Sequence, residues 1–164
     1  MATRWLTDEE QKAWRAYLNA NILLSETLDR QLQRDSGLPH GYYEILVRLS
    51  EAPDRTLRMS QLAEASQSSR SRLSHAVARL EERGWLRREV CPTDRRGQLA
   101  VLTAEGFAAL EAAAPGHVEA VREALFDPLT PAQVRQLREI SEAVLSVLDP
   151  GRAAVMQPAD QRSA

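Results

Sequence analysis

Apolar residues recur at helical spacing near the N-terminus and predict one long helix. It is expected to run from about residue 8 to residue 34 or 35, and Gly37 offers a left-handed stop just beyond it. Thr7 and Glu10 have the spacing of a capping box at its start. The apolar positions are Trp14, Leu18, Ile22, Leu28 and Leu32. Because a long helix at a chain terminus is often an oligomerisation element, we expect residues 7–36 to take part in a dimer interface.

Three further helices are predicted, and the last two are joined by a short turn. Pro39 can occupy the first position of a helix that the 52–54 run (Ala-Pro-Asp) ends. The next helices cover 59–65 and 69–83, with a turn at 66–68 that holds the N-cap candidate and with Gly84 as the stop. The inward positions are Tyr42, Ile45, Leu46 and Leu49, then Leu62 and Ala63, then Leu73, Val77 and Leu80. Two helices this close in sequence form a candidate helix-turn-helix.

A β-hairpin is predicted directly after this candidate helix-turn-helix. Residues 85–90 and 99–102 have the pattern of short strands, on either side of a basic, turn-rich tip at 91–97. A hairpin in this place is the wing of a winged helix-turn-helix. We therefore expect residues 38–103 to form a DNA-binding module, with its recognition helix at about 69–83 and its wing at about 85–102.

Two helices are predicted in the C-terminal part of the chain. Thr103 can cap the first, which should kink or break at the Pro-Gly pair 115–116. Thr130 and Gln133 form the capping box of the second. Its apolar stripe consists of Val134, Leu137, Ile140, Val144, Leu145 and Leu148. We expect 104–148 to complete the helical dimerisation region, 150–164 to be a disordered tail, and the fold to be mainly α with a small β wing.

Composition adds that the chain is a globular protein with one basic segment. Of its 164 residues, 43% are hydrophobic and 27% charged, which excludes wholesale disorder. The net charge is −2, yet residues 67–98 contain eight arginines and four acids, so this segment is basic within an acidic chain. The sequence lacks an apolar run long enough for a membrane span, and residues 1–10 lack the apolar stretch expected of a signal peptide. It has a single cysteine. These features favour the cytoplasm.

Several short motifs occur in an order that resembles the MarR family of winged helix-turn-helix transcription regulators. The most specific is the wing sequence 94–103, Asp-Arg-Arg-Gly-Gln-Leu-Ala-Val-Leu-Thr, which is similar to the family's D-x-R wing followed by an apolar strand and Leu-Thr. Leu62-Ala63, the run 80–86 and the run 126–130 also match. The resemblance covers roughly residues 10–148, by element order.

The resemblance implies a bacterial, two-fold homodimer whose first and last helices intertwine, with two winged modules that bind double-stranded DNA. Exposed residues of the recognition helix are chemically suited to bases and phosphates, and arginine at a wing tip is suited to a minor groove. The residues expected to contact DNA are Ser68, Ser69, Arg70, Ser71, Arg72, Ser74, His75, Arg79, Arg95 and Arg96. Of the wing arginines, the resemblance favours Arg96 as the inserted one. Asp94 is expected to pair with an arginine and to support the wing.

Many MarR-family proteins also bind a small aromatic or phenolic effector between the dimer helices and the winged module. Residues that could contribute to such a pocket are Trp14, Tyr17, Asn21, His40 and Tyr43. The alternative is that these aromatic side chains serve the core or the dimer contact.

The remaining candidate chemistry is sparse. Cys91 has arginines nearby in sequence, which would suit a redox sensor if the thiol were exposed, although a spectator thiol is the default. The three histidines, His40, His75 and His117, lack cysteine or glutamate at ligand spacings, so no metal site and no cofactor are expected. We find none of the sequence motifs of an enzyme.

Two functions remain open on the sequence. The first is a sequence-specific transcription regulator, a dimeric repressor on an inverted repeat that a small molecule releases. The second is a non-enzymatic interaction protein that kept the winged-helix fold and lost DNA binding. The intact basic helix and wing favour the first.

Overall fold

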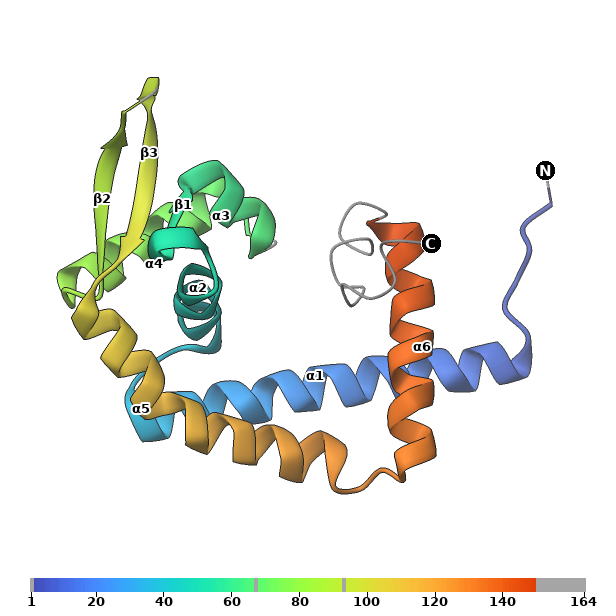
Figure 1. Ribbon diagram of the computed structural model, residues 1–164. Helices are drawn as coiled ribbons and strands as arrows, with labels where there is room; N and C mark the ends of the chain where they lie inside the picture. The colour runs from blue at the N-terminus through green and yellow to red at the C-terminus, as the bar shows by residue number, and fades with distance from the viewer. Residues whose placement is uncertain (1, 67, 93, 150–164) are drawn as a thin grey trace, which may run out of the picture. The chain divides into compact units, whose positions relative to one another are not determined.

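The computed structural model describes residues 2–66, 68–92 and 94–149, with the backbone alone at Arg95 and Arg96 (Figure 1). The chain divides into two compact units, Met1–Val121 and Arg122–Ala164, which are described separately. The sequence-based division instead groups 104–148 with the N-terminal helix. Within the described residues, no helix is long and apolar enough to cross a membrane.

The first unit contains five helices, a single helical turn and three strands among its described residues. In chain order these are α1 (Asp8–Ser36), α2 (His40–Ser50), the turn η1 (Pro53–Arg55), β1 (Thr56–Arg58), α3 (Met59–Ala65), α4 (Arg70–Glu82), β2 (Leu86–Cys91), β3 (Asp94–Leu102) and α5 (Ala104–Val121). The second contains the short π-helix η2 (Arg122–Phe126) and α6 (Pro131–Leu148). The predicted helices and the predicted hairpin are all present.

Helix α1 begins and ends as its sequence predicts. The Thr7 hydroxyl accepts from the backbone N–H of Glu10 at 3.2 Å, and the Glu10 carboxylate accepts from the Thr7 N–H at 2.7 Å. The hydrogen bond from the Thr7 backbone N–H is the main cause of a lowered pKa of Glu10, and the Thr7 side chain lowers it further. At the other end Gly37 adopts φ 63°, where glycine avoids the strain that a Cβ would bring.

One core connects α1, α2, α3, α4, the sheet and the first half of α5. Its centre is made of fully buried apolar side chains: Leu32, Leu46, Leu49, Leu62, Leu73, Val77 and Leu80. From α5 the core takes Leu110 and Ala113. The C-terminal part of α1 is thus packed into the winged module, whereas every residue from Asp8 to Leu23 is exposed.

The three strands form one antiparallel sheet in the order β1-β3-β2. Strand β1 was not predicted, because three residues are too few to show an alternating pattern and its pairing with β3 is non-local: Thr56 lies opposite Val101. Strand β3 begins at Asp94, earlier than the predicted residue 99, with a register irregularity at Val90/Cys91 of β2. The predicted turn at 91–97 therefore belongs largely to the hairpin strands.

Of the kink or break predicted for α5 at Pro115 and Gly116, the break does not occur, because α5 continues to Val121. The reason is tertiary: α5 packs along α1, where a Cβ on Gly116 would lie 3.4 Å from Gln31 Nε2. Next in sequence, His117 Nδ1 lies 3.3 Å from Gln31 Oε1. Packing against a neighbouring helix outweighs the missing N–H of one proline.

In the second unit, α6 starts as predicted. Thr130 caps it, and the Thr130 N–H donates to Gln133 Oε1 at 2.9 Å. None of the residues of α6 is buried, and Val147 and Leu148 are more than 70% exposed. The predicted disordered tail, 150–164, lies outside the described residues.

Candidate nucleic-acid interface

Helix α4 is oriented by its buried leucines and by a serine cap. Leu73 and Leu80 are buried in the core, which turns the opposite face of the helix outward. The N-cap is Ser69, whose hydroxyl accepts from the Arg72 N–H at 3.2 Å. The expectation of an N-cap at 66–68 is therefore wrong. Ser69, which the sequence predicts to contact DNA, is also the N-cap of α4.

The outward face of α4 carries the side chains that the sequence predicts for it. Exposed residues on it are Arg70, Ser71, Arg72, Ser74, His75 and Arg79, and Ser68 before the helix is half-buried. Arg79 Nη1 lies 2.8 Å from Glu82 Oε2, and this hydrogen bond raises the pKa of Arg79. Because Arg79 already has a carboxylate partner, the N-terminal half of α4 holds the more available positive charge.

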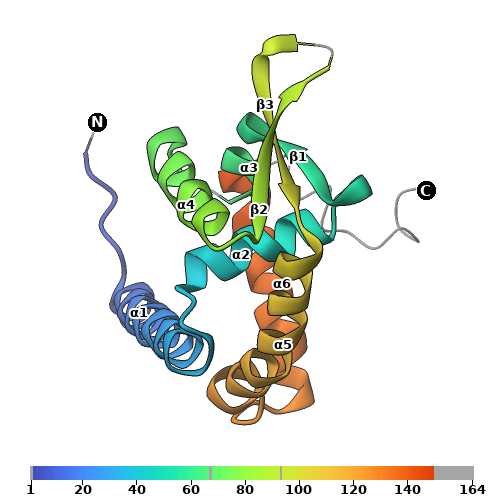
Figure 2. The same ribbon diagram turned by 90° about the vertical axis from the view of Figure 1, so that its left-hand side faces the viewer.

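The hairpin β2–β3 extends beyond α3 and α4 (Figure 2). Its base is tied to α4 by Glu81, whose carboxylate accepts from the Arg88 N–H at 2.8 Å. The same carboxylate pairs with Arg88 Nη2 at 2.5 Å. A backbone contact and an ion pair to one side chain fix the direction in which the wing leaves the recognition helix.

Near the tip, Asp94 pairs with an arginine, as expected, and this arginine, Arg58, lies outside the wing. Arg58 Nη1, at the end of β1, is 3.8 Å from Asp94 Oδ2. Sequence reasoning missed Arg58 because it precedes the basic segment and its neighbourhood depends on the β1–β3 pairing. The backbone of Arg95 and Arg96 lies in β3, and their side chains lie outside the described part of the structure.

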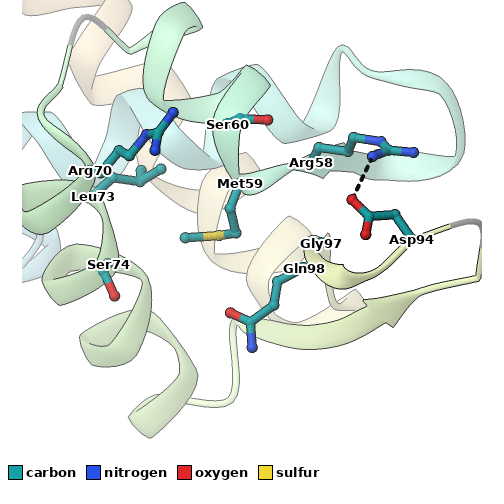
Figure 3. A pocket seen from close by; sticks show the side chains of 9 residues that line it. All are labelled: Arg58, Met59, Ser60, Arg70, Leu73, Ser74, Asp94, Gly97 and Gln98. Carbon is teal, nitrogen blue, oxygen red and sulfur yellow. Dashed lines mark ion pairs between the residues drawn. The ribbon is translucent and has the colours of Figure 1, made fainter.

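A pocket of about 410 Å³ lies between α4, the start of α3 and the wing (Figure 3). Arg70 and Ser74 line it from α4, whereas Arg58 and Gln98 line it from the sheet. Met59 and Leu73 add apolar side chains to its lining. The two predicted DNA-contacting elements thus face one shared hollow of mixed polar and apolar character.

The C-terminal end of α4 is held by a contact that the sequence did not indicate. Arg83 Nη2 donates to the Gly37 carbonyl at 3.0 Å, and its guanidinium lies 5.0 Å from the centre of the Trp85 ring. Thr103 Oγ1 donates to the Gly84 carbonyl at 2.7 Å. These contacts join α4 to the α1–α2 connection and to the start of α5.

The residues proposed for an effector pocket fall into two groups within one protomer. Trp14 and Tyr17 stack on the exposed part of α1, with ring centroids 6.3 Å apart, and Asn21 is exposed near them. His40 instead lies beside Asp29, whose carboxylate accepts from the His40 N–H at 2.9 Å. At 1.5 Å rise per residue, positions 14 and 29 are about 22 Å apart along α1. One protomer therefore does not unite all five residues in one site.

Two of the three histidines, dispersed in sequence, meet in the structure. The rings of His40 and His117 are 5.6 Å apart between centroids, and Tyr43 is 4.6 Å from His117. Burial is the main cause of a lowered pKa of His117, and the neighbouring His40 lowers this pKa further. Burial also raises the pKa of Tyr43. Among the described residues, no group of three or more His, Cys, Asp or Glu side chains is arranged to hold a metal ion.

Cys91 is buried, with 4% of its surface exposed, at the end of β2. The exposure that a redox sensor would need is not found, which favours the alternative of a spectator thiol.

Comparison with known proteins agrees with this geometry. The profile of the MarR family matches residues 36–97. The crystal structure of Sco3205, a MarR-family regulator from Streptomyces coelicolor in complex with DNA, is 58% identical and covers 92% of this chain and 94% of its own, with a TM-score of 0.87. The HTH-type transcriptional regulator PecS of Dickeya dadantii is 32% identical over 73% of this chain and 72% of its own.

A third relative is the HTH-type transcriptional repressor YetL of Bacillus subtilis, 31% identical over 65% of each chain. The helix-turn-helix, the wing and the long flanking helices therefore agree in sequence and in structure with one group of proteins. The chain belongs to the MarR family of transcriptional regulators.

Proposed function

We propose that this regulator is a homodimeric repressor that binds an inverted repeat in double-stranded DNA. The observation that carries the proposal is the outward face of α4, which presents Arg70, Arg72 and His75 above a fully buried Leu73. A major groove admits one helix, and arginine pairs with guanine there. That Sco3205 was crystallised with DNA and that YetL is named a repressor support the assignment.

The proposed dimer would cover apolar surface that one chain leaves exposed. On α1 this surface includes Trp14, Tyr17 and Ile22, each more than half exposed. On α6, Ile140 and Val147 are 62% and 80% exposed. Soluble monomers rarely expose large contiguous apolar patches, so a second copy is the expected partner for residues 7–36 and 104–148. Sedimentation at micromolar concentration tests this, and a stable monomer of 18.3 kDa would contradict it.

DNA binding itself should depend strongly on salt. Two modules should neutralise roughly 6–10 phosphates, so log K should fall with log salt with a slope of about −5 to −9. A slope near zero would contradict the proposal and favour the alternative, an interaction protein that does not bind DNA.

The two reading elements should differ in what their removal changes. Arg72→Ala should cost about 1–3 kcal/mol per half-site and relax specificity at one or two positions. Arg96→Ala should weaken binding more evenly, with the largest loss at flanks that are A·T-rich and narrow. Selection from a randomised half-site library separates the two. Unchanged base preference in Arg72→Ala, with altered central bases in Arg96→Ala, would reverse the roles of helix and wing.

Dimerisation also bears on the effector. Since one protomer separates Trp14 and Tyr17 from His40 and Tyr43, a site that uses all of them would need the partner copy. We propose that any effector binds at such a site between the two copies. We also propose that the protein acts by binding rather than by catalysis, and that it does so in the cytoplasm, where a bacterial regulator meets DNA. Thermal melts with a panel of small aromatic acids would reveal an effector as a concentration-dependent rise in Tm.

A further inference from the structure

The pocket between α4 and the wing carries polar side chains that lie outside the recognition helix. Arg58 and Ser60, at the junction of β1 and α3, face it, and Gln98 of β3 closes it from the wing side (Figure 3). Gly97 contributes no side chain, so the backbone of β3 forms part of the wall. A Cβ on Gly97 would lie 3.1 Å from Asp94 Oδ2 and 3.3 Å from the Asp94 carbonyl oxygen, so the glycine allows a close approach within the hairpin itself.

The pocket lies where the backbone of a bound DNA duplex would be expected to pass. A sugar-phosphate backbone separates each major groove from the adjacent minor groove. If α4 occupies the major groove and the wing reaches the neighbouring minor groove, the strand between them has to cross the surface between α4 and the wing. The pocket occupies that surface, and its rim carries two arginines, Arg58 and Arg70.

We propose that this pocket seats the DNA backbone, with the Arg58 guanidinium on a phosphate and with Ser60 and Gln98 as hydrogen-bond donors beside it. This inference rests on the proposed function and adds a phosphate contact outside the basic segment 67–98. It also makes the wing and the β1–α3 junction one surface.

The Arg58–Asp94 pair gives Arg58 its place at this pocket. Arg58 Nη1 lies 3.8 Å from Asp94 Oδ2, and the two side chains are 41% and 49% exposed. A guanidinium carries five N–H donors in a planar fork, so it can contact a carboxylate on one side and a phosphate on another. Asp94 then serves to position Arg58. This role explains why an acidic residue occurs in an otherwise basic wing tip.

The salt dependence of binding tests the phosphate contact directly. Arg58→Gln removes one proposed contact per protomer and two per dimer, so the slope of log K against log salt should become shallower by about 1.8. Between about 50 and 200 mM salt, wild-type affinity should therefore fall about tenfold more than that of the variant. Arg34→Gln is the matched control. Arg34 is also paired with a carboxylate, Asp35 at 2.7 Å, and it belongs to the last turn of α1, a helix that does not touch the hairpin β2–β3 in Figure 1. Its slope should equal the wild-type slope.

A double variant separates a phosphate contact from mere neutralisation of Asp94. If Arg58 holds a phosphate, Arg58→Gln/Asp94→Asn should keep the shallower slope. If Arg58 serves only to neutralise Asp94, the double variant should return to the wild-type slope, which would overturn the inference. An unchanged slope in Arg58→Gln alone would overturn it as well.

Phosphate ethylation interference locates the contact on the DNA. In the wild type, ethylation should interfere at the phosphates between the helix-read bases and the flanks, and Arg58→Gln should lose interference there while keeping it elsewhere. Interference that Arg58→Gln leaves unchanged would contradict the proposal. Two failures can be told apart. If wild-type protein binds DNA without salt dependence, the proposed function fails. If the wild type shows the expected slope and Arg58→Gln does not change it, only the phosphate contact of Arg58 fails.

Discussion

Replacing Gly106 by alanine tests a close approach between α5 and the backbone at Trp85. Gly106 is the third residue of α5 and packs against the turn between α4 and β2. A Cβ built there would lie 2.1 Å from the Trp85 carbonyl oxygen and 2.9 Å from Leu102 Cδ1. Since real Cβ contacts essentially never fall below 3.0 Å, α5 and the turn would have to separate by about 0.9 Å.

The expected loss of stability follows from two opposing terms. Alanine favours a helix over glycine by up to about 1 kcal/mol. Overpacking typically costs about 1–3 kcal/mol, and a backbone carbonyl cannot turn aside as a side chain can, so we expect about 3 kcal/mol here. The net effect of Gly106→Ala should be a decrease of about 2 kcal/mol in the free energy of unfolding. The carbonyl of Trp85 also accepts from the Thr103 N–H at 3.1 Å, a bond that the separation would strain.

Gly41 supplies a matched control. It also lies near the start of a helix, α2, but a Cβ there meets nothing within 4 Å. Gly41→Ala should therefore stabilise the protein by about 0.4–1 kcal/mol. Urea unfolding at one protein concentration should separate the two midpoints by about 1–3 M, given the usual slopes of about 1–3 kcal/mol/M. Coincident midpoints would refute the argument from close approach.

Three further variants test the core, a cap and a titrating group. Leu73→Ala should lower the free energy of unfolding by about 2–5 kcal/mol because Leu73 is 1% exposed, and base preference measured on folded protein should stay unchanged. Thr103→Ala should cost about 0.5–2 kcal/mol in the same urea assay, since it removes the bond to Gly84 and the cap on the Gly106 N–H at 3.0 Å. Because the pKa of His117 is lowered in the folded state, the unfolded state takes up a proton first as the pH falls below 6.5, so stability should decrease there. Between about pH 7.5 and about pH 5.5 the wild type should lose more Tm than His117→Gln, and equal losses would contradict the assignment.

Local signals in the sequence determined the elements of this protein. The capping box at Thr7, the left-handed Gly37 and the spacing of Leu73, Val77 and Leu80 act over a few residues, so pattern and hydrogen-bond chemistry suffice to predict them. The same holds for the outward face of α4, because burying one side of a helix exposes the other.

Tertiary structure decided what depends on residues distant in sequence. The β1–β3 pairing places Arg58 beside Asp94, and packing of α5 along α1 keeps a helix through Pro115 and brings His117 to His40. Neither contact has a local pattern, because each depends on free energy gained when remote segments share a core. Proline inside a helix costs about 3 kcal/mol relative to alanine, a local term that this packing outweighs. For that reason the helix continues through Pro115, where the sequence predicted a kink or a break.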